Sequence, residues 1–253
     1  MPMKQLLLTV LLALACATTQ AKDQTGTPVF RADYENRELT SGVAGLAADG
    51  PAAKDALEID CSVGRTGKCS LQSRVRMRDD YISGGAFRAE TSTSRIPGTL
   101  YSPGDRFRYR FSLLIDKGWQ ADTRDAIDMV WQFKRFSTHP DMFIAIKGET
   151  LVWRISDQKQ ITLAKALPRG EWVDFDFVVK WSIGDDGLAE LTLTQTGSGK
   201  TDAFKYAGPN LRDAKPRGGY LKWGLYKPGQ KQRQEPFPVG LVHHDDVEVD
   251  RLP

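Results

Sequence analysis

The stretch Tyr220-Leu221-Lys222-Trp223-Gly224-Leu225-Tyr226-Lys227 gives the clearest indication of how this chain of 253 residues folds. Side chains on a β-strand alternate between the two faces of a sheet. One face would carry three apolar side chains: Leu221, Trp223 and Leu225. The other face would carry two phenols, an ammonium group and a glycine: Tyr220, Tyr226, Lys222 and Gly224. The stretch therefore predicts a strand with one buried face and one polar, solvent-facing side.

Similar segments recur along the chain with turn signals between them. Trp172 to Trp181 alternates apolar and polar residues clearly. Asp185-Asp186-Gly187 and Thr196-Gly197-Ser198-Gly199 are typical of turns between antiparallel strands. Further strands are expected at Val29–Tyr34, Ala86–Thr91, Phe107–Ile115, Ile127–Phe133, Met142–Ile146, Leu151–Ile155, Ala189–Gln195 and Gly240–Val249. Sustained helical periodicity is scarce, so the pattern predicts an all-β fold: a two-sheet antiparallel jelly-roll sandwich with a concave polar face.

The N-terminus has the pattern of a signal peptide. A short basic start precedes the apolar run Leu6 to Ala15, and Thr19-Gln20-Ala21 offers small residues for cleavage. The apolar run is too short to span a bilayer. We expect a signal peptide over residues 1–21, a single domain over residues 22–253, and a secreted or periplasmic protein. Lipid anchoring through Cys16 is the alternative.

The composition limits the kinds of ligand and partner that we expect for this protein. The net charge is only +3, which argues against a protein that coats nucleic acid. Basic residues concentrate near Arg106–Arg110, Lys134-Arg135, Lys222 and Lys227–Arg233. This pattern fits an acidic extracellular ligand, and it fits an ordinary solvated basic surface equally well. We expect a monomer. In an exported chain, Cys61 and Cys69 are expected to form a disulfide that closes a short loop.

Polar side chains from three predicted strands could converge on one face. Arg88, Glu90 and Ser92 alternate with apolar neighbours on the first strand, and Gln132 with Lys134 on the second; the third is the strand quoted above. Guanidinium, carboxamide, amines and phenols together suit removal of the proton next to a sugar carboxylate. The carboxylate must be neutralised, and a phenol or amine must move the proton.

These segments resemble those of the β-jelly-roll, concanavalin-like polysaccharide lyases. The likeness rests on Arg88-x-Glu90, Trp131-Gln132-Phe133-Lys134 and Tyr220-x-Lys222-x-Gly224-x-Tyr226, and it extends over roughly residues 30–250. The heparin lyase I-like and glucuronan lyase group is the most similar, and alginate lyases of this fold are more distant. The resemblance implies β-elimination on a uronic-acid polysaccharide.

Carried over by position, the resemblance gives each residue a role. Tyr226 would be the catalytic acid or acid/base, Lys222 its neighbour, and Gln132 the amide that neutralises the substrate carboxylate. The side chains expected to bind substrate are Arg88, Glu90, Tyr220 and His139. The related enzymes commonly have Gln-x-His where this chain has Gln132-Phe133-Lys134. Lys134 would then neutralise charge, or act as the base if burial lowers its pKa. Alternatively, Tyr226 acts at both steps, or the site is inactive.

Other readings of the polar residues remain open. No cofactor is expected, although Asp245 or Asp246 could help to bind calcium, and His243 or His244 could join a carboxylate in a metal site. The same sandwich could be a non-catalytic carbohydrate-binding protein. A third alternative, a glycoside hydrolase using Asp174 and Asp176, lacks the spacing of a catalytic carboxylate pair in the sequence.

Overall fold

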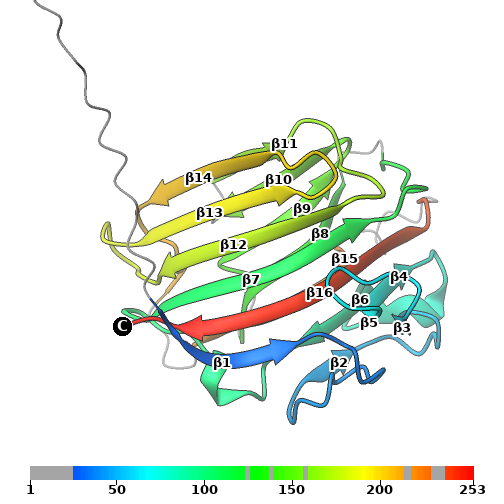
Figure 1. Ribbon diagram of the computed structural model, residues 1–253, viewed down its shortest axis with the longest axis horizontal. Helices are drawn as coiled ribbons and strands as arrows, with labels where there is room; N and C mark the ends of the chain where they lie inside the picture. The colour runs from blue at the N-terminus through cyan, green and yellow to red at the C-terminus, as the bar shows by residue number, and fades with distance from the viewer. Residues whose placement is uncertain (1–24, 123–125, 137–138, 156–158, 214–217, 229–236) are drawn as a thin grey trace, which may run out of the picture.

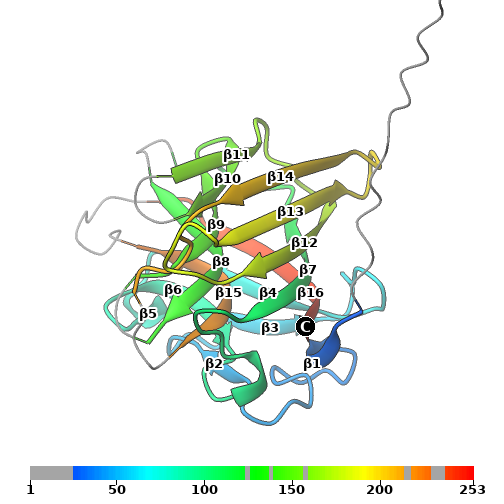
Figure 2. The same ribbon diagram turned by 90° about the vertical axis from the view of Figure 1, so that its left-hand side faces the viewer.

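A computed structural model describes residues 25–122, 126–136, 139–155, 159–213, 218–228 and 237–253. The chain forms two antiparallel sheets of eight strands each, packed face to face and not closed into a barrel (Figures 1 and 2). This is the jelly-roll sandwich that the alternating segments predict. Residues 1–24 lie outside the described residues, so the signal peptide and Cys16 anchoring stay predictions. Within the described ranges, no helix is long and apolar enough to cross a membrane.

Sheet A has the strand order β14-β13-β12-β7-β16-β4-β3, and β1 also pairs with β16. Its strands are β1 (Thr27–Ala32), β3 (Leu57–Asp60), β4 (Ser70–Val75), β7 (Arg106–Ile115), β12 (Trp172–Lys180), β13 (Leu188–Gln195), β14 (Thr201–Ala207) and β16 (Gly240–Arg251).

Sheet B has the order β11-β10-β9-β8-β15-β6-β2, and β5 pairs with β6. Its strands are β2 (Ala47–Asp49), β5 (Ile82–Ser83), β6 (Ala86–Ser92), β8 (Ile127–Arg135), β9 (Met142–Lys147), β10 (Thr150–Ile155), β11 (Lys159–Ala164) and β15 (Gly219–Lys227). Two short 3-10 helices, Asp79–Tyr81 and Pro97–Thr99, complete the regular structure of the described residues.

A line of aromatic rings crosses the core between the sheets. Phe111 stacks on Phe175 of the same sheet, with centroids 4.6 Å apart, and on Trp131 of sheet B at 3.8 Å. Trp131 then stacks near Trp223 at 5.7 Å, and Trp223 meets Phe30 of β1 edge-on at 5.9 Å. Large buried rings contribute much of the burial energy of a core. Because Trp131 and Trp223 point inward, the alternate residues of β8 and β15 point outward.

A bulge in β15 interrupts this alternation at Gly224. The register with β8 shifts between Trp223 and Tyr226, and Gly224 has a φ of +126°. A Cβ at this position would lie 2.2 Å from the carbonyl oxygen of Ala89. Glycine is therefore required here by both backbone conformation and space. The bulge still leaves Lys222 and Tyr226 on the outer side of the sheet.

The disulfide between Cys61 and Cys69 is confirmed, and it closes a loop that lies on the outer face of sheet A. The backbone N–H of Arg65 in this loop donates to Asp245 of β16 at 2.8 Å. Asp245 is only 1% exposed. Burial, together with the neighbouring negative charge of Asp246, raises the pKa of Asp245 to about 7, although two backbone N–H groups oppose the shift.

The raised pKa of Asp245 makes stability depend on pH. Between its unfolded pKa near 4 and its folded pKa of about 7, the folded state binds the extra proton, so stability falls as pH rises through this window. We expect Asp245→Asn to flatten the decline in melting temperature between pH 5 and pH 8, measured by differential scanning calorimetry. Asp202→Asn, at a half-buried carboxylate of β14, serves as the control. Parallel pH profiles for the wild type and Asp245→Asn would refute this assignment.

Candidate active site

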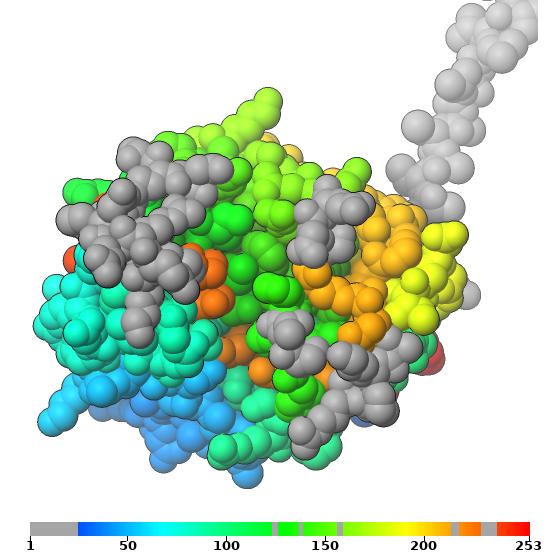
Figure 3. Space-filling view, turned by 180° about the vertical axis from the view of Figure 1, so that it is seen from behind, coloured from blue at the N-terminus to red at the C-terminus, as the bar shows by residue number. Residues whose placement is uncertain are grey.

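The three strands predicted to carry the polar cluster lie side by side in sheet B, in the order β8-β15-β6. The register sets Lys222 opposite Gln132 on one side and Ser92 on the other. Arg88 stands opposite Tyr226. Figure 3 looks onto this face of the molecule, where orange residues are seen between the cyan and the green segments. The polar side chains therefore share one outer face, as the alternation predicts.

Glu90 is the centre of the cluster. Its side chain comes from β6, and the residue is 1% exposed. The amide nitrogen of Gln132 donates to one carboxylate oxygen at 2.5 Å, and the ammonium of Lys222 lies 2.9 Å from the other. A buried carboxylate is stable only when such partners replace its hydration. Glu90 therefore joins Gln132 and Lys222 into one rigid unit.

Asp49 completes this ionic network from β2. Its carboxylate lies 2.6 Å from the Lys222 ammonium, and the Arg88 guanidinium lies 3.8 Å from both Asp49 and Glu90. Burial would lower the pKa of Lys222, but the two carboxylates outweigh burial and raise it. Lys222 is thus a fixed cation and is unsuited to act as a proton acceptor.

Arg88 links this network to Tyr226. Its guanidinium carbon lies 4.5 Å from the centre of the Tyr226 ring, within the range of a cation–π contact. Tyr226 also packs against an apolar patch of sheet B that contains Met129 and Phe143. The ring therefore contacts both a cation and apolar side chains, while the residue stays partly exposed.

Lys134 and Tyr220 face each other at the other end of the cluster. The Lys134 ammonium donates to the Arg135 carbonyl at 3.1 Å. Burial and the positive charge of Lys222 lower the pKa of Lys134, although Glu90 opposes this. Burial raises the pKa of Tyr220, with Lys222 opposing. The direction of the Lys134 shift is the one that a lysine base requires.

The structure brings together most of the residues that the sequence nominates. Seven of them share the outer face of β6, β15 and β8: Arg88, Glu90, Gln132, Lys134, Tyr220, Lys222 and Tyr226. His139 is exposed beyond the end of β8, and no interaction of the described residues joins it to the cluster. Substrate binding by Glu90 stays a prediction; its contacts hold Gln132 and Lys222 in place.

Asp49 is the member of the cluster that sequence reasoning missed. It ends a strand of three residues, Ala47–Asp49, within a polar segment rich in glycine and alanine. So short an edge strand has too few residues to show alternation. Its only sequence signal is a lone carboxylate, which a solvated loop would carry equally well.

Many of the basic residues that suggested an acidic ligand lie elsewhere, which corrects that expectation in part. Arg108 and Arg110 project from β7 of sheet A, where they pair with carboxylates. Arg135 and Lys227 are buried in ion pairs with Asp141 and Asp128, respectively. Arg88, Lys134 and Lys222 lie on the outer face of sheet B, and so does Arg154 of β10, which stands opposite Phe143. Residues 229–233 of the last basic segment lie outside the described residues.

The proposed metal ligands of β16 have other partners. Asp245 accepts the N–H of Arg65, and Asp246 accepts the hydroxyl of Thr66 at 2.8 Å. His244 is fully buried near Phe111, and burial lowers its pKa to about 3. Among the described residues, no group of three or more His, Cys, Asp or Glu side chains is arranged to hold a metal ion. Calcium binding stays a prediction.

The family model described as "Polysaccharide lyase" matches residues 34–247. The chain belongs to this family and is a polysaccharide lyase. No curated protein matches the chain in sequence.

Solved structures of similar fold include lyases and hydrolases. The endo-β-1,4-glucuronan lyase of the fungus Trichoderma reesei is 15% identical, with a TM-score of 0.62 over 88% of this chain and 95% of that one. The PL-14 alginate lyase of Aplysia kurodai is 10% identical, with a TM-score of 0.58 over 90% and 100%. The catalytic domain of a glycoside hydrolase family 131 protein of Coprinopsis cinerea is 12% identical, with a TM-score of 0.60 over 90% and 96%. At these identities, the likeness shows the fold alone.

The ionic network makes Glu90 essential to stability. We expect Glu90→Gln to reduce the free energy of unfolding by about 3 kcal/mol, because removing one partner of a buried ion pair leaves the other poorly compensated. Urea denaturation measures this loss. Glu190→Gln removes one carboxylate of an exposed pair with Lys205 and should change stability by less than ~0.5 kcal/mol. Equal losses for the two variants would contradict the account.

Proposed function

We propose that this polysaccharide lyase is exported and cleaves a uronic-acid polysaccharide by β-elimination on the outer face of sheet B. The observation that carries the proposal is the convergence of Gln132, Lys222 and Arg88 on Glu90 and Asp49, beside Tyr226. Export is supported by the apolar run near the N-terminus and by the disulfide.

The first requirement of β-elimination is to stabilise the charge that develops when the C5 proton leaves. The uronate carboxylate then carries additional negative charge, and preorganised donors nearby lower the barrier. Gln132 has one amide N–H that remains after its bond to Glu90, and Arg88 is partly exposed. Both would donate to the carboxylate, while the fixed charge of Lys222 adds a positive field.

The second requirement is proton transfer at C5 and at the neighbouring glycosidic oxygen on C4. Tyr226 lies six residues from Tyr220 along β15, roughly 20 Å of extended strand. This distance is too long for Tyr226 and the Lys134–Tyr220 pair to act on adjacent atoms of one sugar. Gln132 and Lys222 lean toward Glu90, which pairs with Gly224 near Tyr226. The donors thus favour the sugar bound beside Tyr226.

Tyr226 would then act at both steps. Its phenolate takes the C5 proton, the electrons form the C4–C5 double bond, and the C4–O bond breaks. The resulting phenol gives its proton to the departing oxygen, which becomes the new end of the other fragment. No water is consumed, and Tyr226 returns to its starting state. Lys134 would add positive charge at the next position along the polymer.

The test is to compare Tyr226→Phe with the wild type on a panel of uronic-acid polymers. Product formation is followed by the ultraviolet absorbance of the new conjugated double bond. We expect Tyr226→Phe to lose at least ~100-fold in kcat/KM, because acid–base groups typically contribute that much. Lys134→Gln should lose much less. Tyr206→Phe, at a partly exposed tyrosine of β14 in sheet A, is the matched control and should keep full activity.

The outcomes separate the alternatives. If Lys134→Gln abolishes the signal and Tyr226→Phe keeps it, Lys134 is the base and our assignment is wrong. If the wild type releases reducing ends without the absorbance, the enzyme is a hydrolase. If it retains the polymers and releases no product, the site only binds carbohydrate.

A further inference from the structure

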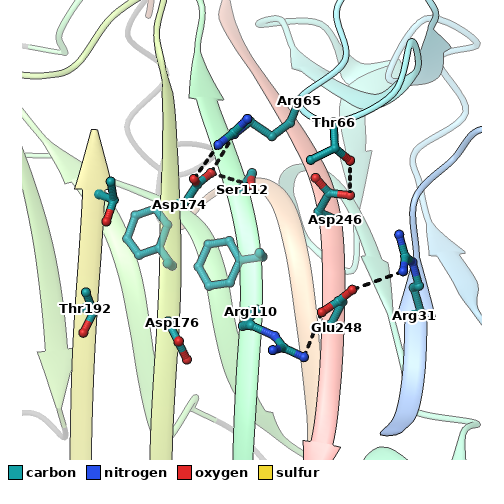
Figure 4. A pocket seen from close by; sticks show the side chains of 13 residues that line it. Arg31, Arg65, Thr66, Arg110, Ser112, Asp174, Asp176, Thr192, Asp246 and Glu248 are labelled. Atoms are coloured by element: carbon teal, nitrogen blue, oxygen red, sulfur yellow. Dashed lines mark hydrogen bonds and ion pairs between the residues drawn. The ribbon is translucent and has the colours of Figure 1, made fainter. Parts of the chain in front are cut away.

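A second polar groove lies on the outer face of sheet A, on the side of the sandwich opposite the candidate active site (Figure 4). We call it the outer groove. It has a volume of about 600 Å³, within the range of small-molecule sites. It crosses five neighbouring strands, a span of ~19 Å. The side chains that define it are Arg31, Arg65, Arg110, Asp174, Thr192 and Glu248.

The charged groups of the outer groove neutralise one another. Arg65 makes two parallel hydrogen bonds to Asp174, at 2.9 and 2.8 Å. On neighbouring strands, Arg110 lies 2.9 Å from Glu248, and Arg31 lies 3.5 Å from the same carboxylate. Asp174 and Glu248 each face a guanidinium, and Asp176 pairs with Arg108, so most of the charge in the groove is cancelled. A highly charged polymer would gain little there.

What the groove offers is a fixed array of hydrogen-bonding groups. Ser112 donates to Asp174 at 2.8 Å, and Thr66 donates to Asp246 at 2.8 Å. Thr192 is exposed, and no side-chain hydrogen bond to it occurs among the described residues. Carboxylate oxygens retain further acceptor positions, and guanidinium groups retain further N–H donors. Donors and acceptors in alternation complement a ligand rich in hydroxyl groups.

The groove is also rigid. Its floor consists of strand residues backed by Phe111 and Phe175, whose rings stack 4.6 Å apart in the core. One wall is the disulfide loop, which carries Arg65 and Thr66 (Figure 4). Groups held in place before binding lose little entropy when a ligand arrives. This compensates for the absence of a strong electrostatic attraction.

We propose that the outer groove binds a neutral oligosaccharide segment and has no catalytic role. The enzyme would hold an uncharged glycan on sheet A while it cleaves an acidic one on sheet B. In a hydrolase, Asp174 and Asp176 would be the catalytic carboxylates. Here each carboxylate accepts hydrogen bonds from an arginine. The Asp176 carboxylate is fixed by Arg108 at 2.6 Å.

The experiment is native affinity electrophoresis in gels that contain glucomannan, xyloglucan or β-1,3-glucan. Thr192→Arg and Thr66→Arg place a long side chain into the groove from two sides, one from strand β13 and one from the disulfide loop, and both positions are exposed. Ala207→Arg adds the same side chain to the exposed strand β14 of this sheet, outside the groove. We expect at least one neutral polysaccharide to retard the wild type and Ala207→Arg. Both groove variants should bind it at least fivefold more weakly.

Binding and catalysis are measured separately in this test. Unchanged melting curves show that the variants are folded, and Tyr226→Phe should be retarded as strongly as the wild type. The proposal is overturned if no neutral polysaccharide retards the wild type, or if the groove variants are retarded as strongly as Ala207→Arg. Either result leaves the proposal for sheet B untouched, because that one is judged by product formation.

Discussion

The buried carboxylate of Glu90 is the constraint on which the arrangement of the candidate active site depends. A carboxylate that is removed from water must be compensated by hydrogen bonds and positive charge. Gln132 and Lys222 supply both, from the two strands β8 and β15. These long side chains would otherwise be free to move in solvent. Their fixed position toward Tyr226 therefore follows from the cost of leaving Glu90 unpaired.

The two outer faces of the sandwich use charge differently. On sheet B, Arg88 and Lys222 share the carboxylates of Asp49 and Glu90, and Lys134 adds a further cation. On sheet A, the arginines of β1, β7 and the disulfide loop pair with carboxylates of β12 and β16. The first arrangement leaves a positive excess for an acidic substrate, while the second leaves hydrogen-bonding capacity without excess charge. The aromatic stack between the sheets keeps these faces apart.

The sequence predicts a large part of this structure because alternation is a local property. Trp131 and Trp223 are inward-facing, and Gln132 and Lys222 are outward-facing, as period-2 reading requires. The strands that escaped prediction are of two kinds. β2 and β5 are very short, whereas β3, β4, β11 and β14 carry weaker apolar alternation. These segments form strands because they pair with a neighbouring strand of the sheet.

The contacts within the site depend on information that is not local. Arg135 and Lys227 are buried because each forms an ion pair, with Asp141 and Asp128, respectively. The alternation of residues along a strand does not identify these partners. The bulge at Gly224 arises where β15 meets β6 and β8, and no single strand specifies it. Glu90 is likewise buried because β6, β15 and β8 lie side by side in sheet B.

The most direct test of the account is a crystal structure of Tyr226→Phe with a bound uronic-acid tetrasaccharide. The account predicts the sugar on the outer face of sheet B, with one carboxylate within hydrogen-bonding distance of the Gln132 amide and the Arg88 guanidinium. Its C5 should face the ring of residue 226. A tetrasaccharide bound only to sheet A, or bound to sheet B with its carboxylates turned away from Gln132 and Arg88, would contradict the account.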